Sequence, residues 1–388
     1  MNLSERRYDV KKEPVLRFPG FEGEWEQRKL GELCQIEKGK QINKKTLSTS
    51  GKYYVLNGGI NPSGYTDKFN TEANTISINE GGSCGFVKLN TTRFWSGGHN
   101  YTLLKPKCEV KYLYNYLKYR EKYINSLAVG TGIPNIQKKV LQEAVSVSYP
   151  PIQEQTKIGS FLATIDALIS ETEKELEACR EQKRGMLQKM FPKKGADMPE
   201  IRFPGFTDAW EQRKFGDVGS VAMCKRIFKE QTSDEGDVPF YKIGTFGGEP
   251  DAYISQELFD EYKAKYPFPN KGDILISASG SIGRTVEFTG GNEYFQDSNI
   301  VWLKHGKDID NSFLKILYNV VEWSCEGSTI KRLYNDNFLK TEFMLPNIDE
   351  QKKIGEYFCS LDNLITLHQR ELDRLLEMKK GFMQKMFC

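Results

Sequence analysis

The stretch RFPGFEGEWEQRKLGEL at residues 17–33 recurs as RFPGFTDAWEQRKFGDV at residues 202–218, 185 positions further along the chain. A second stretch, IQEQTKIGSFLATIDALI from residue 152, recurs as IDEQKKIGEYFCSLDNLI from residue 348, and the same register continues into KRGMLQKMF and KKGFMQKMF. The second offset is 196, so the later copy holds eleven additional residues between its two shared ends. A long internal repeat of this kind indicates that the chain consists of two copies of one structural unit.

The segments between the shared ends have diverged further than the ends. ISINEGGSCGFV from residue 76 is similar to ILISASGSIGRTV from residue 274, GTGIPNI from residue 130 faces GSTIKRL from residue 327, and Asn100 is aligned with Asn299. Both middles alternate short β-branched or aromatic runs with Gly, Asn and Pro turns, and each has a few helical stretches, such as those from residue 110 and from residue 311. The pattern predicts two mixed α/β domains and favours duplication followed by divergence of a recognition surface.

Each shared C-terminal stretch predicts a long helix. Neither contains proline for about 38 residues, and apolar residues recur every three or four positions over more than four heptads, which is typical of a coiled-coil seam. The predicted seam positions are Ile158, Leu162, Ile165, Ile169, Thr172, Leu176, Cys179, Lys183, Met186 and Met190 in the first helix and Ile354, Phe358, Leu361, Ile365, His368, Leu372, Leu375, Lys379, Phe382 and Met386 in the second.

The polar interruptions of the seam coincide in the two copies, Thr172 with His368 and Lys183 with Lys379. Such residues either fix the register and the number of partners or are merely tolerated in a long seam. Because neither helix has another apolar partner in the chain, we expect the two to pair antiparallel. About 30 paired residues would form a rod of ~45 Å, which could hold two readers about one turn of B-DNA (~34–36 Å) apart.

Length and composition limit the class of protein. A chain of 388 residues favours two domains. Its 55 Lys and Arg against 52 Asp and Glu leave a net charge of +3, so any basic surface requires segregation of the charges. The eight cysteines form no CxxC pair and there are three histidines, so neither a metal site nor a disulfide framework is expected. The charged N-terminal stretch and the lack of a ~20-residue apolar run predict a cytoplasmic protein with reduced thiols.

Catalytic motifs are missing from the sequence. It contains no GxxxxGK[ST] loop and no HExxH, and the turns GGSCGF and SGSIGR lack the GxGxxG spacing. SYPPI at residues 148–152 reverses the order of the Asn/Asp-Pro-Pro-aromatic loop of adenine methyltransferases, and prolines suit the start of a helix. We therefore predict no catalytic residues.

Four features together carry a family resemblance: FPGF followed by Trp at the head of each copy, the GSCG and GSIG turns, the IQEQ and IDEQ helix starts, and the closing QKMF. In this twofold arrangement, which spans nearly the whole chain, the sequence resembles the specificity (S) subunit of bacterial type I restriction–modification systems. The resemblance implies an α+β fold with two pseudo-symmetric mixed α/β target-recognition domains, joined and separated by two long helices in an antiparallel coiled coil. The expected parts are an arm at 1–14, recognition domains at 15–151 and 201–347, long helices at 152–190 and 348–388, and a linker at 191–200.

The resemblance also implies a function and partners. Each domain would read one half of a bipartite double-stranded DNA target, the helices would set the spacer, and the chain itself would be non-catalytic. Two methyltransferase (M) subunits would methylate adenine with S-adenosylmethionine, and restriction (R) subunits would cleave DNA with ATP and Mg. A coiled-coil scaffold without nucleic-acid binding is the alternative, and a stand-alone methyltransferase or nuclease is disfavoured by the missing motifs. The target bases, the spacer length, the half-site read by each domain and the number of R subunits stay open.

Polar and basic residues near the predicted turns of the unshared middles are the candidates for DNA contact, because donors and acceptors on loops can reach phosphates and base edges. In the first copy they are Lys38, Lys40, Asn43, Lys44, Asn57, Asn61, Ser83, His99, Asn100, Lys138 and Lys139. In the second copy they are Lys225, Arg226, Lys229, Lys242, Thr245, Ser279, Ser281, Arg284, Gln296, Asn299, Lys331, Arg332 and Tyr334.

Residues that both copies share are assigned differently, because a recognition code should lie in unshared positions. Trp25 and Trp210 are expected to be core anchors rather than base-stacking groups. The shared Glu-Gln pairs that begin the long helices, at 154–155 and 350–351, suit either a structural role or identical docking of M subunits.

Overall fold

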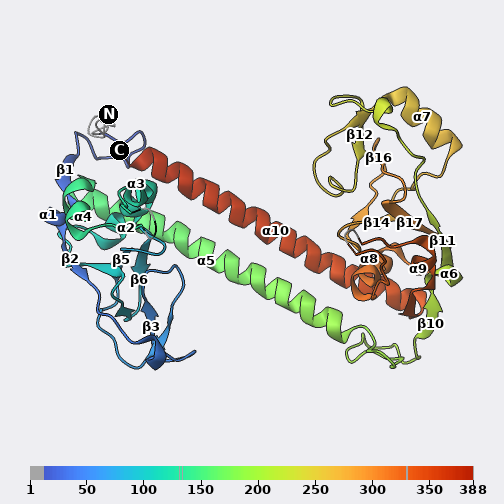
Figure 1. Ribbon diagram of the computed structural model, residues 1–388, viewed down its shortest axis with the longest axis horizontal. Helices are drawn as coiled ribbons and strands as arrows, with labels where there is room; N and C mark the ends of the chain where they lie inside the picture. Colours follow the sequence, from blue (N-terminus) through green and yellow to red (C-terminus); the bar gives the residue numbers. More distant parts are fainter. Residues whose placement is uncertain (1–12, 131, 133, 329–330, 388) are drawn as a thin grey trace. The chain divides into compact units, whose positions relative to one another are not determined.

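The computed structural model describes residues 13–130, 132, 134–328 and 331–387, and the chain divides into two compact units (Figure 1). Unit 1 comprises residues up to 174 together with those from 369 onward, and unit 2 comprises residues 175–368. Each unit therefore contains one globular domain and a part of each long helix. Most of the predicted arm at 1–14, and parts of the GTGIPNI and GSTIKRL stretches, lie outside the described residues.

The globular domain of unit 1 is built on a pair of strands, a four-stranded sheet and a three-stranded sheet. All strand pairs are antiparallel except β3 with β7. The strands are, in sheet order, β1 (Glu26–Lys29) with β9 (Ser146–Tyr149); β2 (Gln35–Lys38), β8 (Asn100–Leu104), β5 (Thr75–Asn79) and β6 (Val87–Asn90); and β4 (Gly64–Thr66), β3 (Tyr53–Leu56) and β7 (Trp95–Ser96). The helices are α1 (Leu30–Leu33), the 3₁₀ turn η1 (Lys44–Thr46), α2 (Val110–Tyr119), α3 (Glu121–Ser126) and α4 (Lys138–Ala144).

Unit 2 repeats this topology strand for strand, with β12 and β16 as its parallel pair. Its strands are β10 (Glu211–Lys214) with β18 (Glu342–Leu345); β11 (Gly219–Ala222), β17 (Ile300–His305), β14 (Ile274–Ser277) and β15 (Thr285–Glu287); and β13 (Tyr253–Ile254), β12 (Val238–Tyr241) and β16 (Tyr294–Phe295). Its helices are α6 (Phe215–Val218), η2 (Lys229–Gln231), α7 (Gln256–Lys265), α8 (Asn311–Val320) and α9 (Asn335–Lys340). The helix α7 has no counterpart among the described residues of unit 1. The eleven additional residues of the second copy therefore lie between β13 and β14.

Strand register corrects one predicted correspondence between the copies. Asn100 lies opposite Asn79 in the β5–β8 ladder, and Ile300 lies opposite Ser277 in the β14–β17 ladder. Likewise the carbonyl of His99 accepts from the amide of residue 80, as the carbonyl of Asn299 accepts from the amide of residue 278. His99 therefore corresponds to Asn299, and the predicted match of Asn100 with Asn299 is wrong by one residue, a shift that reverses the face of a strand.

The shared ends of each copy meet in space and form a base for the domain. In unit 1 the guanidinium of Arg17 donates to both carboxylate oxygens of Glu154, at 2.7 and 2.9 Å. In unit 2 Arg202 makes the same bidentate pair with Glu350, at 2.6 and 2.7 Å. The glutamate side chains are 0% and 1% exposed, so a buried ion pair ties the head of each copy to its tail.

The glutamine that follows each of these glutamates is also used inside the base. Gln155 accepts from the backbone amide of Glu109 at 2.9 Å and donates to the carbonyl of Pro150 at 2.7 Å. Gln351 accepts from the amide of Asp310 and donates to the carbonyl of Pro346. The shared Glu-Gln pairs therefore have a structural role, because their side chains are buried and hydrogen-bonded within their own unit.

The long helices are α5 (Ile152–Lys189) and α10 (Ile348–Met386), and portions of them pair antiparallel within each unit. In unit 1 Phe161 contacts Phe382 edge to face, with ring centroids 4.9 Å apart, and Lys379 pairs with Asp166. In unit 2 Lys183 Nζ lies 2.5 Å from Asp362 Oδ1. Every predicted seam position is buried or half-buried, so the predicted antiparallel seam is confirmed within each unit.

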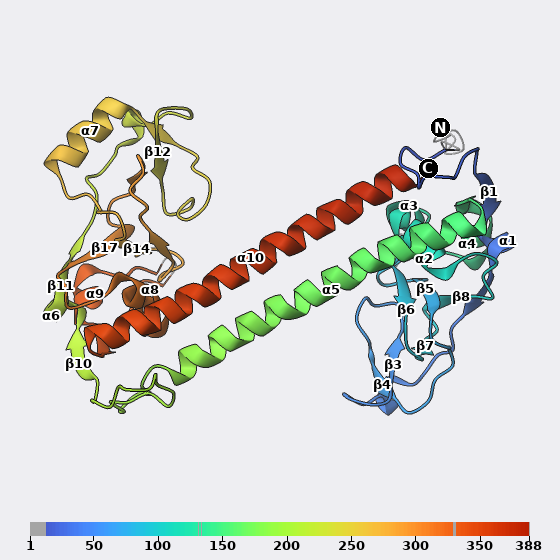
Figure 2. The ribbon, with the colours of Figure 1, turned by 180° about the vertical axis from the view of Figure 1, so that it is seen from behind.

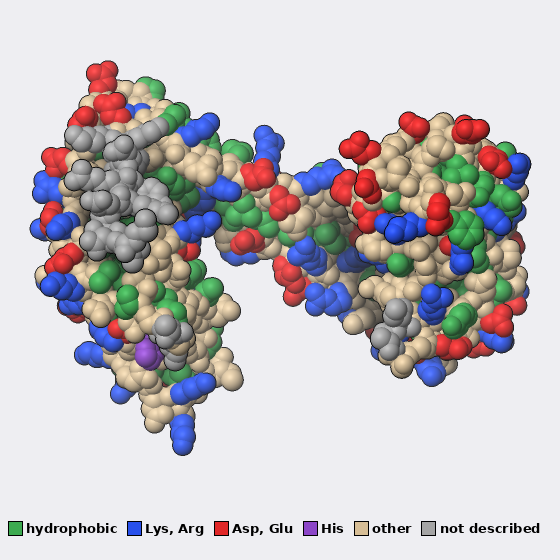
Figure 3. Space-filling view, turned by 45° about the horizontal axis from the view of Figure 1, so that its top comes forward, with side chains coloured by type: hydrophobic (Ala, Val, Ile, Leu, Met, Phe, Trp, Pro, Cys, Tyr) green, Lys and Arg blue, Asp and Glu red, His purple; other side chains and the backbone are tan. Residues whose placement is uncertain are grey.

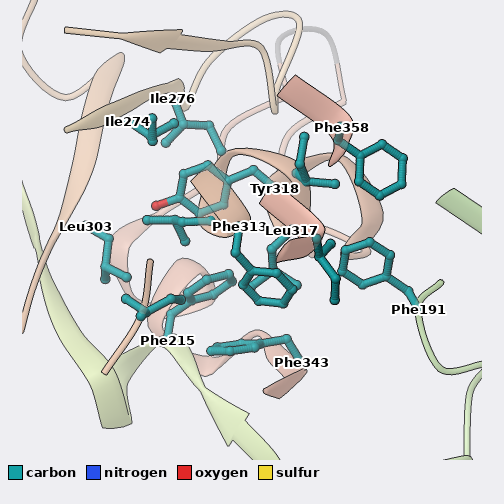
Figure 4. Close-up of a cluster of buried hydrophobic side chains, with 14 of the residues drawn as sticks. Phe191, Phe215, Ile274, Ile276, Leu303, Phe313, Leu317, Tyr318, Phe343 and Phe358 are labelled. Atoms are coloured by element: carbon teal, nitrogen blue, oxygen red, sulfur yellow. The ribbon is translucent and has the colours of Figure 1, made fainter. Parts of the chain in front are cut away.

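The closing QKMF motif inserts an aromatic ring into a domain core. In unit 1 Phe387, which follows α10, packs against Tyr112 and Tyr116 with centroids 5.7 and 5.4 Å apart. In unit 2 Phe191, which follows α5, stacks on Phe313 at 5.7 Å, and Figure 4 shows it beside Phe313 and Phe358 in the buried cluster. Each domain core is thus completed by the end of the helix that belongs to the other copy. Trp25 and Trp210, 2% and 3% exposed, are core residues as predicted.

In each domain the helices of the base lie at one end and the three-stranded sheet lies at the other. In unit 1 the helices α2, α3 and α4 lie beside α5, whereas β3 and β4 lie at the opposite end of the domain (Figures 1 and 2). In unit 2 α8 and α9 lie beside α10, whereas α7, β12 and β16 lie at the opposite end. The central strands TISIN and ILIS join the two parts and are buried along their whole length.

Candidate nucleic-acid interface

Loops from distant parts of the first unshared middle converge in unit 1, and we call this surface the unit 1 rim. Gly58 and Gly82 allow two of these loops to approach closely, since a Cβ on Gly82 would lie 2.6 Å from the carbonyl oxygen of Gly58. The amide of His99 donates to Asn57 Oδ1 at 3.1 Å, and Gly81 bridges to the loop that precedes α4. The loops of the rim are residues 38–44, 57–61, 80–84, 96–100 and 134–139.

All predicted contact residues of the first copy lie in the unit 1 rim, but they differ in exposure. Asn100 is fully buried and donates to Ser96 Oγ at 3.3 Å, so it supports the rim from below. The prediction that Asn100 is exposed for DNA contact is therefore wrong. Asn57 and Ser83 are half-buried. The exposed candidates are Lys38, Lys40, Asn43, Lys44, Asn61, His99, Lys138 and Lys139.

The equivalent loops of unit 2 form the unit 2 rim. Arg284 donates to the carbonyl of Ile243 at 2.6 Å, and the amide of Ile243 donates to Gln296 Oε1 at 2.8 Å. Ser279 bridges to Arg332 across the rim, as Gly81 does in unit 1. The loops are residues 223–229, 242–248, 278–284, 295–299 and 331–334.

The predicted contact residues of the second copy also lie in these loops. Ser279 is only 6% exposed, because it continues a central strand. The prediction that Ser279 is exposed for DNA contact is therefore wrong. The half-buried candidates are Lys242, Thr245, Gln296 and Asn299. The exposed candidates are Lys225, Arg226, Lys229, Ser281, Arg284, Lys331, Arg332 and Tyr334.

Several rim cations are paired with acids that sequence reasoning missed. Lys38 Nζ lies 2.6 Å from the carboxylate of Glu80, and Arg226 Nε lies 2.8 Å from Asp297. Glu80 follows β5 directly and precedes a glycine, and Asp297 lies two residues after β16 and precedes a serine. A search for basic residues alone does not find these acids. The rims are therefore mixed in charge, and Figure 3 shows Lys and Arg interspersed with Asp and Glu on the visible face.

Other chemistry is sparse in the described part of the chain. Among the residues that the structure describes, no group of three or more His, Cys, Asp or Glu is placed to hold a metal ion. Burial raises the pKa of the thiols of Cys34, Cys108 and Cys224 to about 12. No helix in the described ranges is long and apolar enough to cross a membrane.

Two repeated domains with divergent rims on a common base define a class of protein with paired recognition modules. Comparison with known proteins specifies the class, because the family model for the type I restriction modification DNA specificity domain matches residues 22–178 and again 207–377. The chain therefore belongs to the type I restriction–modification specificity subunit family.

Individual relatives agree with this assignment. A putative type I restriction enzyme specificity subunit of Haemophilus influenzae is 39% identical over 360 residues, which cover 89% of this chain and 90% of the relative. The MjaVIII specificity subunit of Methanocaldococcus jannaschii is 27% identical over 399 residues, covering 93% and 91%. The crystal structure of the S subunit of the type I system from M. genitalium superposes with a TM-score of 0.72 at 23% identity, covering 97% and 99%, and shows the same fold.

The predicted family and fold class are confirmed, as is the role of a DNA specificity subunit with two target-recognition domains. Specificity subunits are recognition subunits and not catalysts. The alternative of a scaffold that does not bind nucleic acid receives no support from these relatives.

Proposed function

We propose that each unit reads one half of a bipartite double-stranded DNA target through its rim. The observation that carries the proposal is the division of each domain into a shared base and an unshared rim. Trp25 and Glu154, like their equivalents Trp210 and Glu350, are shared by both copies and buried in the base, whereas the converging loops differ between the copies. The exposed and half-buried rim candidates would supply donors to base edges and cations to phosphates.

Exchange of one domain tests this reading. Replacing residues 34–148 with the corresponding segment of another specificity subunit is expected to change one half of the methylated motif and leave the other half intact. Sequencing of methylated adenines across a genome, before and after the exchange, measures the outcome. A change in both halves would refute independent reading by the two units.

The long helices are proposed to set the spacer between the two half-sites. Both are uninterrupted, with 38 and 39 residues, and the cross-helix pairs Lys183–Asp362 and Lys379–Asp166 occupy equivalent positions in the two units. Lengthening the helix within residues 174–182 is expected to alter the gap in the methylated motif or to prevent assembly. An intact complex with an unchanged gap would contradict the role of the helices as a ruler.

Two M subunits, one for each repeat, are proposed as partners, with R subunits joining for cleavage in the cytoplasm. Leu168 and Leu364 support twofold docking, because they are equivalent under the 196-residue offset and are 46% and 44% exposed. S-adenosylmethionine, ATP and Mg would be bound by the partners. Changing both leucines to serine is expected to lower the number of M subunits bound per chain, measured by mass photometry, whereas the single changes would each remove one.

A further inference from the structure

Glu80 lies at the centre of a small polar network in the unit 1 rim. The ammonium of Lys38 is 2.6 Å from each carboxylate oxygen of Glu80. The hydroxyl of Tyr101 donates to Glu80 Oε1 at 2.9 Å, and His99 Nδ1 lies 3.9 Å from Oε2. The backbone of Glu80 is fixed as well, since its amide donates to the carbonyl of His99 and its carbonyl accepts from the amide of Ile136.

The carboxylate is held inside while its cationic partner points outward. The side chain of Glu80 is 15% exposed, whereas those of Lys38 and His99 are 52% and 60% exposed. Both oxygens of Glu80 already accept from side chains of the network, so the carboxylate is occupied as an acceptor. Its effect is therefore on Lys38, whose long side chain would otherwise sample many rotamers.

The fold does not require this network, as unit 2 demonstrates. Met223 stands at the position of Lys38, Ala278 at that of Glu80 and Val301 at that of Tyr101, as the equivalent ladders and backbone hydrogen bonds show. Ala278 and Val301 are each 2% exposed, and Met223 packs against the same apolar cluster.

An apolar set thus fills these positions in a domain of the same topology. A largely buried carboxylate is expensive to desolvate, so its retention in unit 1 alone points to a role in recognition rather than in folding.

We propose that Glu80 is a positioning residue that fixes the ammonium of Lys38 toward the acceptor edge of a guanine in the half-site read by unit 1. Guanine presents two acceptors, O6 and N7, in the major groove, and a lysine ammonium is a natural donor to them. This inference rests on the proposed reading of DNA by the rim. Unit 2 fixes a cation differently, because Arg226, in the loop equivalent to that of Lys38, is held by Asp297 (17% exposed) from the loop 295–299, so its half-site is read by a different arrangement.

The test compares methylation by the assembled complex of full-length chain and M subunits on a library of randomised half-sites. The variants are Glu80→Gln, which keeps the shape but removes the charge, Lys38→Met, and the triple change K38M/E80A/Y101V, which copies unit 2. Each is expected to reduce discrimination at one G·C position of the unit 1 half-site by roughly fivefold or more, with the other half-site unchanged. Glu26→Gln is the matched control, because Glu26 holds an exposed arginine, Arg28, on β1 in the base.

The outcomes separate this inference from the function on which it rests. If the unchanged complex methylates no defined sequence, the proposed function fails. If the unchanged complex is specific but E80Q keeps the base preference at every position, with unaltered thermal unfolding, the positioning role is refuted. A variant that only binds all DNA more tightly, with a steeper salt dependence and the same preference, would also refute it, because Glu80 would then merely tune the charge of the rim.

Discussion

The base and the rim of the two units have diverged to very different extents. In the base, Arg17 with Glu154 and Arg202 with Glu350 make the same bidentate pair at nearly the same distances. In the rim, the charged network around Glu80 in unit 1 is replaced by apolar side chains in unit 2.

The base has diverged less than the rim because its residues depend on one another. Base contacts join the head of each copy to its tail, so a change on one side leaves a buried partner behind. Rim loops carry exposed side chains that can change singly, and a coupled set such as Lys38, Glu80 and Tyr101 can be replaced as a whole without loss of the fold. The comparison therefore predicts that equivalent changes in the two bases have equal effects, whereas equivalent changes in the two rims do not.

Removing the buried carboxylate should have the largest effect. Glu154→Ala and Glu350→Ala are each expected to lower the free energy of unfolding by about 3–5 kcal/mol, because the guanidinium is left buried without its counter-ion. Urea unfolding of the full chain measures the loss. The control is Glu211→Ala, whose partner Arg213 is largely exposed, and which should change stability little. A marked difference between the two glutamate variants would show that the bases are not energetically equivalent.

The helical glycines sharpen the same comparison. A Cβ on Gly159 would lie 2.8 Å from the amide nitrogen of Tyr112, and one on Gly355 would lie 2.9 Å from that of Phe313, at the start of α2 and α8. Gly159→Ala and Gly355→Ala should each cost about 1–3 kcal/mol through overpacking.

Gly185 and Gly381 provide the matched control for these glycines. They lie in the same two helices, and a Cβ added at either would meet no neighbouring heavy atom of the described residues within 4 Å. Alanine at either position should stabilise the helix by about 0.5–1 kcal/mol. Thermal unfolding of all four variants gives the comparison. Destabilisation by the control changes as well would contradict the assignment of the loss at Gly159 and Gly355 to their close packing.

The sequence was sufficient to predict the features that repeat or recur with a period. The duplication, the two long helices, their antiparallel seam and the buried Trp25 and Trp210 all follow from spacing that is visible in one dimension. The location of the rim candidates on turns was predicted from Gly, Asn and Pro, because these residues end strands.

The features that the sequence did not predict depend on residues that are distant in the chain and meet only in the folded structure. Glu80 meets Lys38 across 42 positions of sequence, and no local pattern connects them. The prediction of Asn100 as a surface residue rests on the glycine turn before it, but Asn100 is the first residue of β8 and is turned inward by strand alternation. The role of QKMF was also hidden, because Phe387 completes the core of a domain that lies hundreds of residues earlier in the chain.

The polar seam residues allow a smaller test of equivalence between the units. Lys183→Glu opposes Asp362 in unit 2, and Lys379→Glu opposes Asp166 in unit 1, so each should cost roughly 1 kcal/mol or less at low salt. Combining Lys183→Glu with Asp362→Lys should restore the stability if the pair fixes the register. If Lys183→Glu lowers the stability and the added Asp362→Lys does not restore it, the alternative is supported, namely that these polar residues are simply tolerated in the seam.

The buried thiols also distinguish the two units. Burial raises the pKa of Cys34 and Cys108 in unit 1, and of Cys224 in unit 2, from the ordinary 9.0 to about 12. Between pH 9 and 12 the unfolded thiols lose protons that the folded ones keep, so stability falls as the pH rises, and the thiol contribution to this loss is larger in unit 1, which holds two of the three.

Labelling of the native chain with a thiol reagent at pH 8, read by peptide mass spectrometry, should modify half-buried Cys325 well before Cys34 or Cys224. Labelling of the buried thiols should accelerate about tenfold per pH unit, because the reactive thiolate fraction grows by that factor below the pKa. Equal labelling of Cys34 and Cys325 at pH 8 would contradict the burial of Cys34, which lies between α1 and β2 in the sequence. Faster labelling of Cys224 than of Cys34 would instead show that unit 2 opens more readily, and would place the difference between the units in their dynamics rather than in their packing.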